Sequence, residues 1–116
     1  AASRGSGLKR GMRGSESDFM KNTNPLEKDI EKKVCDYAKA QGCLCYKFTS
    51  PSRRSVPDRL FITPNGMVFF IEFKRLGEKP TASQTVEIEK IRKNKVSVSV
   101  IDNVPMGKML VDLMLL

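Results

Sequence analysis

The stretch VPDRLFITPNGMVFFIEFK, residues 56–74, decides the fold. Two apolar runs, at 58–63 and 67–74, are separated by the tripeptide Pro64-Asn65-Gly66. An Asn-Gly pair between two such runs is a strong signal for a tight turn. The stretch therefore predicts a β-hairpin of two antiparallel strands.

Charged side chains are predicted to meet at the end of this hairpin that lies far from the turn. Residues two apart on a strand share a face, so Glu72 and Lys74 point the same way, and Asp58 at the start of the first strand lies beside them. Carboxylate oxygens are the ligands that Mg²⁺ prefers, and a lysine can orient a water or stabilise charge on a phosphate. The set suits phosphodiester hydrolysis. The alternative is that Asp58 ends a turn and that Glu72 and Lys74 form an exposed ion pair.

The sequence on either side of the hairpin predicts helices and two further strands. A helix is expected from an Asn24 cap and Pro25 to Gln41-Gly42, and its apolar stripe is Leu26, Ile30, Val34, Tyr37 and Ala38. Strands are expected at 43–48 and 96–101. Thr81 and Gln84 have the spacing of a capping box, which predicts a helix to about Lys93 with apolar contacts from Val86, Ile88 and Ile91. Pro105 is expected to start a last helix. This order predicts an α/β domain with a mixed central sheet flanked by helices.

Composition narrows the possible chemistry. The chain has 116 residues, a length typical of one domain, and 21 Lys and Arg against 13 Asp and Glu give a net charge of +8. It has no histidine, which excludes a Ser-His-Asp triad, a Cys-His pair and an HExxH zinc site. The basic balance favours a nucleic-acid partner. No stretch reaches the roughly 18 apolar residues of a membrane helix, so we expect no membrane partner and a cytoplasmic location.

Two further features concern the N-terminus and the cysteines. Residues 1–19 are rich in Gly, Ser and Arg and are interpreted as a vector-derived leader, with 20–116 as a single domain; a native basic arm is the alternative. The odd number of cysteines, namely Cys35, Cys43 and Cys45, fits a reducing compartment and three small core residues.

The hairpin also resembles a known family. Val56-Pro57-Asp58 followed by Ile71-Glu72-Phe73-Lys74 resembles the PD-(D/E)xK nuclease superfamily, and most closely its virus-type replication-repair nuclease (VRR-NUC) domains of the stand-alone phage type. The likeness extends over about Leu26 to Ile101 and includes Tyr46-Lys47-Phe48, Ser50-Pro51, Arg53-Arg54 and Gln84. One departure is Ser55, where the family usually has a glycine before Val-Pro-Asp. It puts the local loop geometry in question because glycine permits positive φ.

The resemblance implies a restriction-endonuclease-like fold and a role for each matching residue. Asp58, Glu72 and the Phe73 carbonyl would ligate Mg²⁺ or Mn²⁺, and Lys74 would position the attacking water. A glutamate of the first helix would complete the site. Glu27 is preferred, although it also has capping-box spacing from Asn24, and Glu31 on the same helix face is the fallback. Gln84 belongs either to the site or to the cap of Thr81.

These residues predict a metal-dependent DNA endonuclease, and the family resemblance points to branched, Holliday-junction-like DNA. Basic residues around the site suit a phosphate backbone, and the candidates for DNA contact are Arg53, Arg54, Lys47, Arg59 and Arg75, with Lys79 nearby. The last segment, MGKMLVDLMLL, carries more apolar side chains than one core-facing stripe needs, which predicts a homodimer. Two alternatives are a non-catalytic DNA-binding module and a flap or nicking nuclease subunit that needs a partner.

Overall fold

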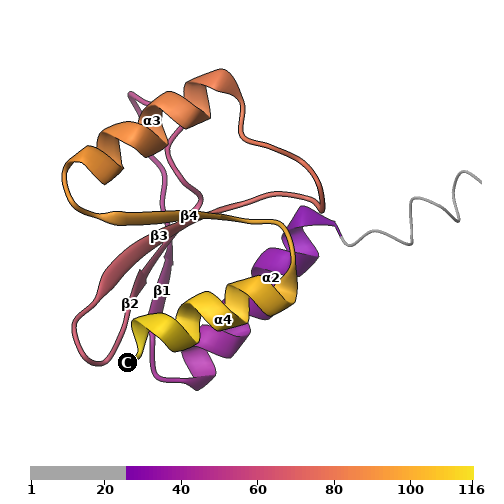
Figure 1. Cartoon of the computed structure of the whole chain (residues 1–116), viewed down its shortest axis with the longest axis vertical. Helices are drawn as coiled ribbons and strands as arrows, with labels where there is room; N and C mark the ends of the chain where they lie inside the picture. The colour runs from indigo at the N-terminus through magenta and orange to yellow at the C-terminus, as the bar shows by residue number, and fades with distance from the viewer. Residues whose placement is uncertain (1–25) are drawn as a thin grey trace, which may run out of the picture.

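A computed structural model describes residues 26–116 (Figure 1). The predicted leader and the expected cap at Asn24 and Pro25 lie outside the described residues. The elements, in chain order, are α2 (Glu27–Ala40), β1 (Leu44–Lys47), β2 (Arg59–Ile62), β3 (Val68–Phe73), α3 (Ala82–Lys93), β4 (Ser97–Ile101) and α4 (Val104–Met114). The order matches the prediction, and the chain has the predicted α/β class.

The four strands form one mixed sheet in the order β1-β2-β3-β4. β2 and β3 are the predicted hairpin, paired antiparallel with Arg59 opposite Ile71 and Ile62 opposite Val68. β1 adds antiparallel to β2, and β4 adds parallel to β3. The parallel pair needs a crossover, and α3 supplies it. The hairpin is thus central, and its site end lies between neighbouring strands on both sides.

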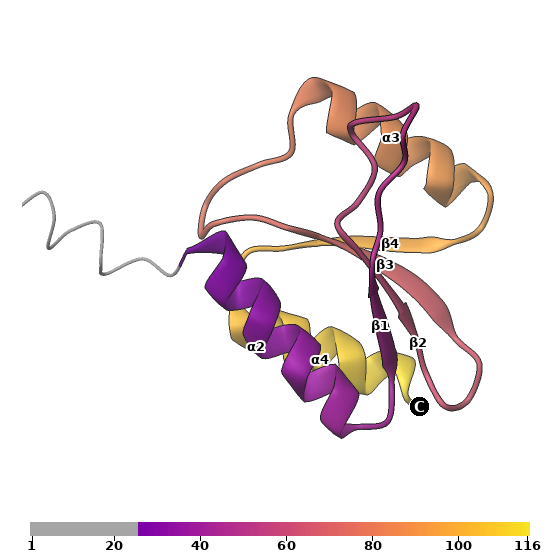
Figure 2. The same cartoon turned by 180° about the vertical axis from the view of Figure 1, so that it is seen from behind.

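Helices cover the two faces of the sheet unequally. α2 and α4 lie side by side against one face, and α3 lies across the other (Figures 1 and 2). The α2–α4 face holds the core, in which Ile30, Val34, Phe61, Phe69, Ile71, Phe73 and Val111 are fully buried. On α3 only Ile88 is buried, while Val86 of the predicted apolar set is 53% exposed. The α3 face is therefore the thinner and more polar layer.

Helix ends follow the predicted signals with two corrections. The Thr81–Gln84 capping box is present, and α2 ends at Ala40, followed by its C-cap Gln41 and by Gly42 with a φ of +93°. α2 as described begins at Glu27 after Leu26, which has no capping side-chain bond and is exposed, so the predicted place of Leu26 in the buried stripe is wrong. α4 begins at Val104, one residue before Pro105, because the Asn103 side chain caps it by accepting from the Met106 amide.

Close approach of α4 to α2 depends on a glycine. Gly107 is buried, and a Cβ at this position would overlap a methyl group of Val34, which is itself fully buried.

The cysteines fit the core prediction in part, because Cys35 and Cys43 are buried whereas Cys45 is partly exposed, and all three are free thiols. In the part of the chain that the structure describes, no helix has the length and apolar character needed to cross a membrane.

Candidate active site

Asp58 is fixed at the far end of the hairpin by two backbone contacts. Its carboxylate Oδ2 accepts a hydrogen bond from the Phe73 amide at 3.0 Å, and its own carbonyl accepts from the Phe48 amide at 2.8 Å. The side chain thus bridges to β3 while the backbone continues the β1–β2 pairing. Burial raises the pKa of Asp58, and the Phe73 amide opposes that shift. Asp58 is therefore held beside Glu72, as the sequence predicts.

Glu72 is a buried carboxylate between two polar partners. It is only 2% exposed, its Oε2 lies 3.5 Å from Lys74 Nζ, and it accepts a hydrogen bond from Gln84 Nε2 at 3.0 Å. Burial and the nearby Asp58 charge raise the pKa of Glu72 to about 7, against the effect of Lys74. The exposed ion pair considered as an alternative for Glu72 and Lys74 is thus wrong, because both side chains are largely buried.

Gln84 joins the helix cap to this cluster. Its Oε1 accepts from the Thr81 amide at 2.9 Å, while its Nε2 donates to Glu72. The two roles considered from the sequence therefore coexist in one side chain. Because the cap fixes the amide, Gln84 presents its NH₂ group to Glu72 in a defined orientation.

The two glutamates of α2 have different surroundings. Glu31 Oε2 lies 2.5 Å from Arg59 Nε, in an ion pair whose side chains are 16% and 23% exposed. Glu27, on the first turn, forms no hydrogen bond or ion pair with any described residue. Burial and then the Asp58 charge raise the pKa of Glu27. Both glutamates lie close enough to Asp58 to interact electrostatically; among residues 26–116 Glu31 forms an ion pair, whereas Lys74 acts on Glu27 only from a greater distance and lowers its pKa.

The donor set fits a divalent cation that takes few protein ligands. Asp58 and Glu72 are two largely buried carboxylates that repel each other, and a bound cation would relieve that repulsion. Mg²⁺ is usually held by one or two carboxylates with water and phosphate oxygens completing its shell. Among residues 26–116, no group of three Asp, Glu or Cys side chains stands ready to enclose a metal. The arrangement thus corresponds to an open two-carboxylate site.

The predicted DNA-contacting cations divide into two groups. Arg59 is paired with Glu31, and Arg53 Nη1 lies 2.8 Å from Glu87 Oε1. Arg54, Lys47 and Arg75 have no carboxylate partner within residues 26–116, and Lys47 acts on Asp58 electrostatically. The second group is the better placed for a phosphate backbone.

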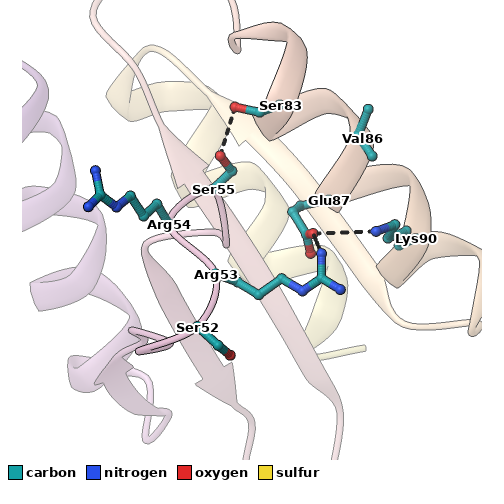
Figure 3. A pocket seen from close by; sticks show the side chains of 8 residues that line it. All are labelled: Ser52, Arg53, Arg54, Ser55, Ser83, Val86, Glu87 and Lys90. Carbon is teal, nitrogen blue, oxygen red and sulfur yellow. Dashed lines mark hydrogen bonds and ion pairs between the residues drawn. The ribbon is translucent and has the colours of Figure 1, made fainter.

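Sequence reasoning missed the contact between the 48–58 loop and α3. This loop leaves the sheet after β1 and reaches α3 before returning to β2 (Figure 2). Two bonds hold it there, from Arg53 to Glu87 and from Ser55 Oγ to Ser83 Oγ at 2.8 Å (Figure 3). Glu87 lies one turn after Gln84, and this spacing could have placed it on the same helix face.

Ser55 is compatible with its position. Within residues 26–116, the only residue other than glycine with a positive φ is Lys95. Ser55 therefore does not need the conformational freedom of the glycine that the family usually has there. Its hydroxyl instead supplies one of the two bonds that fix the loop on α3.

Comparisons with known proteins concern the fold and the sequence as a whole. No family profile matches the sequence. A solved structure of a VRR-NUC domain is similar to this chain with a TM-score of 0.69 and 30% sequence identity, over 74% of this chain and 94% of that one. The chain is also 49% identical over 61 residues to the protein named "Putative nuclease p44" of Acyrthosiphon pisum secondary endosymbiont phage 1. That match spans 53% of this chain and 66% of the phage protein, just under two thirds of its length.

The likeness in fold covers nearly all of the solved domain and is accompanied by substantial sequence identity. Together with the predicted hairpin motif at the far end of β2 and β3, it shows that this chain belongs to the VRR-NUC family of nuclease domains.

Proposed function

We propose that this chain is a Mg²⁺- or Mn²⁺-dependent endonuclease that hydrolyses phosphodiester bonds in branched DNA. The observation that carries the proposal is the convergence of Asp58, Glu72 and Lys74 at one end of the central hairpin, with Gln84 bound to Glu72. A buried carboxylate, Glu72, and a partly buried one, Asp58, repel each other and raise the free energy of the empty site, which favours cation binding.

Each residue has a distinct task in this proposal. Asp58 and Glu72 would hold the metal, with the Phe73 carbonyl as a third ligand, and Glu27 would hold the metal or a water bound to it. When bound, the metal would polarise the phosphate and lower the pKa of a coordinated water. Lys74 would orient the attacking water and stabilise the charge that develops on the phosphate. Gln84 would keep the Glu72 carboxylate in one orientation, because the α3 cap fixes the amide.

A basic surface beside the site supports DNA as the substrate. Arg54, Lys47 and Arg75 lack carboxylate partners among the described residues, and the whole chain has a net charge of +8. Such cations bind phosphates without reading sequence, so affinity should fall steeply with salt.

A homodimer is part of the same proposal. Four apolar side chains on or just after α4 are between 47% and 93% exposed, namely Met106, Met109, Leu113 and Leu116. A two-fold dimer through this surface would set two sites in symmetric positions, which suits paired cuts at a junction. Light scattering should give twice the mass of 13.0 kDa, and Leu113→Glu should give the monomer mass. A monomer for the unmodified chain would favour the flap or nicking role instead.

Cleavage of defined DNA structures tests the function. Labelled four-way junction, flap and linear duplex should be incubated with the full chain and Mg²⁺, Mn²⁺ or EDTA. We expect cleavage of the branched substrates with metal and none with EDTA. Binding to all three without cleavage under any metal would instead identify the chain as a non-catalytic DNA-binding module. Activity in EDTA would exclude the metal-dependent mechanism.

A further inference from the structure

Two neighbouring cavities lead from the candidate active site to α3. One, of about 300 Å³, is bounded by Lys47 and Asp58 on the hairpin side. The second, of about 360 Å³, lies between the 48–58 loop and α3 (Figure 3). Arg53 and Arg54 line both. A strand of DNA with its phosphate at Asp58 could therefore extend along this path to α3. The volume of each cavity falls in the range of small-ligand sites.

The second cavity differs from a simple phosphate site because it contains a carboxylate. Glu87 Oε1 lies 2.8 Å from Arg53 Nη1 and 3.7 Å from Lys90 Nζ, so part of the positive charge is already neutralised. Glu87 Oε2 accepts no hydrogen bond from any described residue. An ionised carboxylate accepts hydrogen bonds and cannot donate them. The free oxygen therefore favours a ligand with an N–H group over a ligand with an oxygen anion at this point.

The other walls of the cavity fit the remaining parts of a nucleotide. Val86, which is 53% exposed, offers an apolar surface against which a base could lie. Arg54 points away from Glu87 and has no carboxylate partner among the described residues, so it is available for a phosphate (Figure 3). A base inside a duplex is stacked on both sides and cannot lie on Val86, whereas an unpaired base can.

We propose that this second cavity binds one unpaired nucleobase of the DNA substrate and that Glu87 accepts a hydrogen bond from its exocyclic amino group. Carboxylates accept from the amino group of cytosine in the same way in known base contacts. Thymine has no such amino group: its one donor on this edge is the ring N3–H, and the carbonyl oxygen that takes the place of the cytosine amino group would be repelled by Glu87, so cytosine is preferred. The inference rests on the proposed action on DNA and names Glu87 as a residue that determines base preference.

Binding of single-stranded oligonucleotides in EDTA tests the inference without cleavage. We expect fluorescence anisotropy to show that the full chain binds labelled oligo-dC at least about fivefold more tightly than oligo-dT. In Glu87→Gln the ratio should fall to about one, because an amide can donate to the thymine carbonyl. Glu89→Gln is the matched control: it removes the same charge from the same helix, from a side chain that is 61% exposed, and should keep the ratio.

A second variant separates base recognition from loop anchoring. Arg53→Ala breaks the same ion pair but leaves the carboxylate, so it should weaken binding of both oligonucleotides and keep their ratio. A ratio of one in the unmodified chain, or a Glu87→Gln variant that binds both oligonucleotides more tightly with an unchanged ratio, would overturn the inference. Cleavage of branched DNA by a chain with no base preference would leave the nuclease proposal intact. A base preference without any cleavage would support the inference about Glu87 and would contradict the proposed nuclease activity.

Discussion

The two faces of β3 carry different parts of the molecule. Phe69, Ile71 and Phe73 point into the core beneath α2 and α4 and are fully buried. Glu72 and Lys74 point to the other side, where Glu72 meets Gln84 of α3. α2 packs on α4, β1 and β3, whereas α3 packs on β4 and reaches β3 and the 48–58 loop through side-chain hydrogen bonds. One face thus provides stability, and that stability allows the buried Glu72 and the partly buried Asp58 to persist as a repelling pair at the site.

The largest expected effect is a loss of cleavage activity, with a smaller change in stability, when Lys74 or Asp58 is replaced. Lys74→Ala or Asp58→Ala should lower the cleavage rate roughly 10²–10⁴-fold, because each removes a group that contacts water, metal or phosphate. Thermal unfolding should change less than in a core truncation, since neither side chain belongs to the apolar core, and the loss should be larger for Lys74→Ala, which removes the cation beside the buried Glu72. Single-turnover cleavage and circular dichroism melts of the same preparations check both expectations. Near-normal turnover in Lys74→Ala would contradict the assigned mechanism.

The opposite face should show the reverse pattern. Phe69→Ala removes a fully buried ring that stacks on Phe61 with a centroid distance of 5.0 Å. The truncation should lower the free energy of unfolding by about 3–5 kcal/mol, from lost burial and the cavity left behind. Urea denaturation monitored by circular dichroism measures it. Phe70→Ala, on the α3 side of the same strand and only partly buried, is the matched control and should cost less.

Much of this architecture follows from local sequence. The hairpin is specified by the Asn65-Gly66 turn and by apolar residues on both strands, and α3 by its capping box. These signals work because they act between residues close in sequence. A helix that begins at Glu27 is harder to predict, because Leu26 caps it without a side-chain bond, a feature that no propensity rule favours.

The site was less accessible to prediction than the fold. Asp58, Glu72 and Lys74 share one hairpin, so register alone indicated that they meet. The pairing of Glu31 with Arg59, and of Arg53 with Glu87, joins segments 28 and 34 residues apart. Such contacts depend on how helices lie on the sheet, which charge patterns alone do not determine. The family resemblance supplied roles for the residues but not these partners.

The raised pKa of Glu72 predicts that the stability of the folded chain depends on pH. The pKa is about 7 in the folded chain against an ordinary value of 4.5, so the folded state holds its proton more tightly than the unfolded state between these values. Stability should therefore fall as pH rises from about 4.5 to about 7 and stay lower above it. Glu72→Gln lacks this ionisation and should be more stable above pH 7 by roughly 2–3 kcal/mol, with the gap closing near pH 4.5.

Thermal melts across pH measure this difference, and metal provides the control. In the unmodified chain above pH 7, Mg²⁺ should raise the melting temperature, because it compensates the charges of Asp58 and Glu72. In Glu72→Gln the increase should be smaller. A gap between the two proteins that does not change with pH would show that ionisation of Glu72 is not its source.

The smallest expected difference separates the two glutamates of α2, which lie one turn apart. Glu31 pairs with Arg59, so Glu31→Gln should lower the free energy of unfolding by about 1 kcal/mol and leave cleavage within a few fold. Glu27 forms no ion pair among residues 26–116, and burial and the charge of Asp58 raise its pKa against the effect of Lys74. Glu27→Gln should therefore preserve stability and weaken Mg²⁺ binding, which titration calorimetry and cleavage at graded Mg²⁺ concentrations would report. Equal losses of activity in both variants would remove the preference for Glu27. A loss of cleavage activity in Glu31→Gln alone would identify Glu31 as the metal-binding glutamate. It would also mean that Arg59 releases the Glu31 carboxylate when the metal binds.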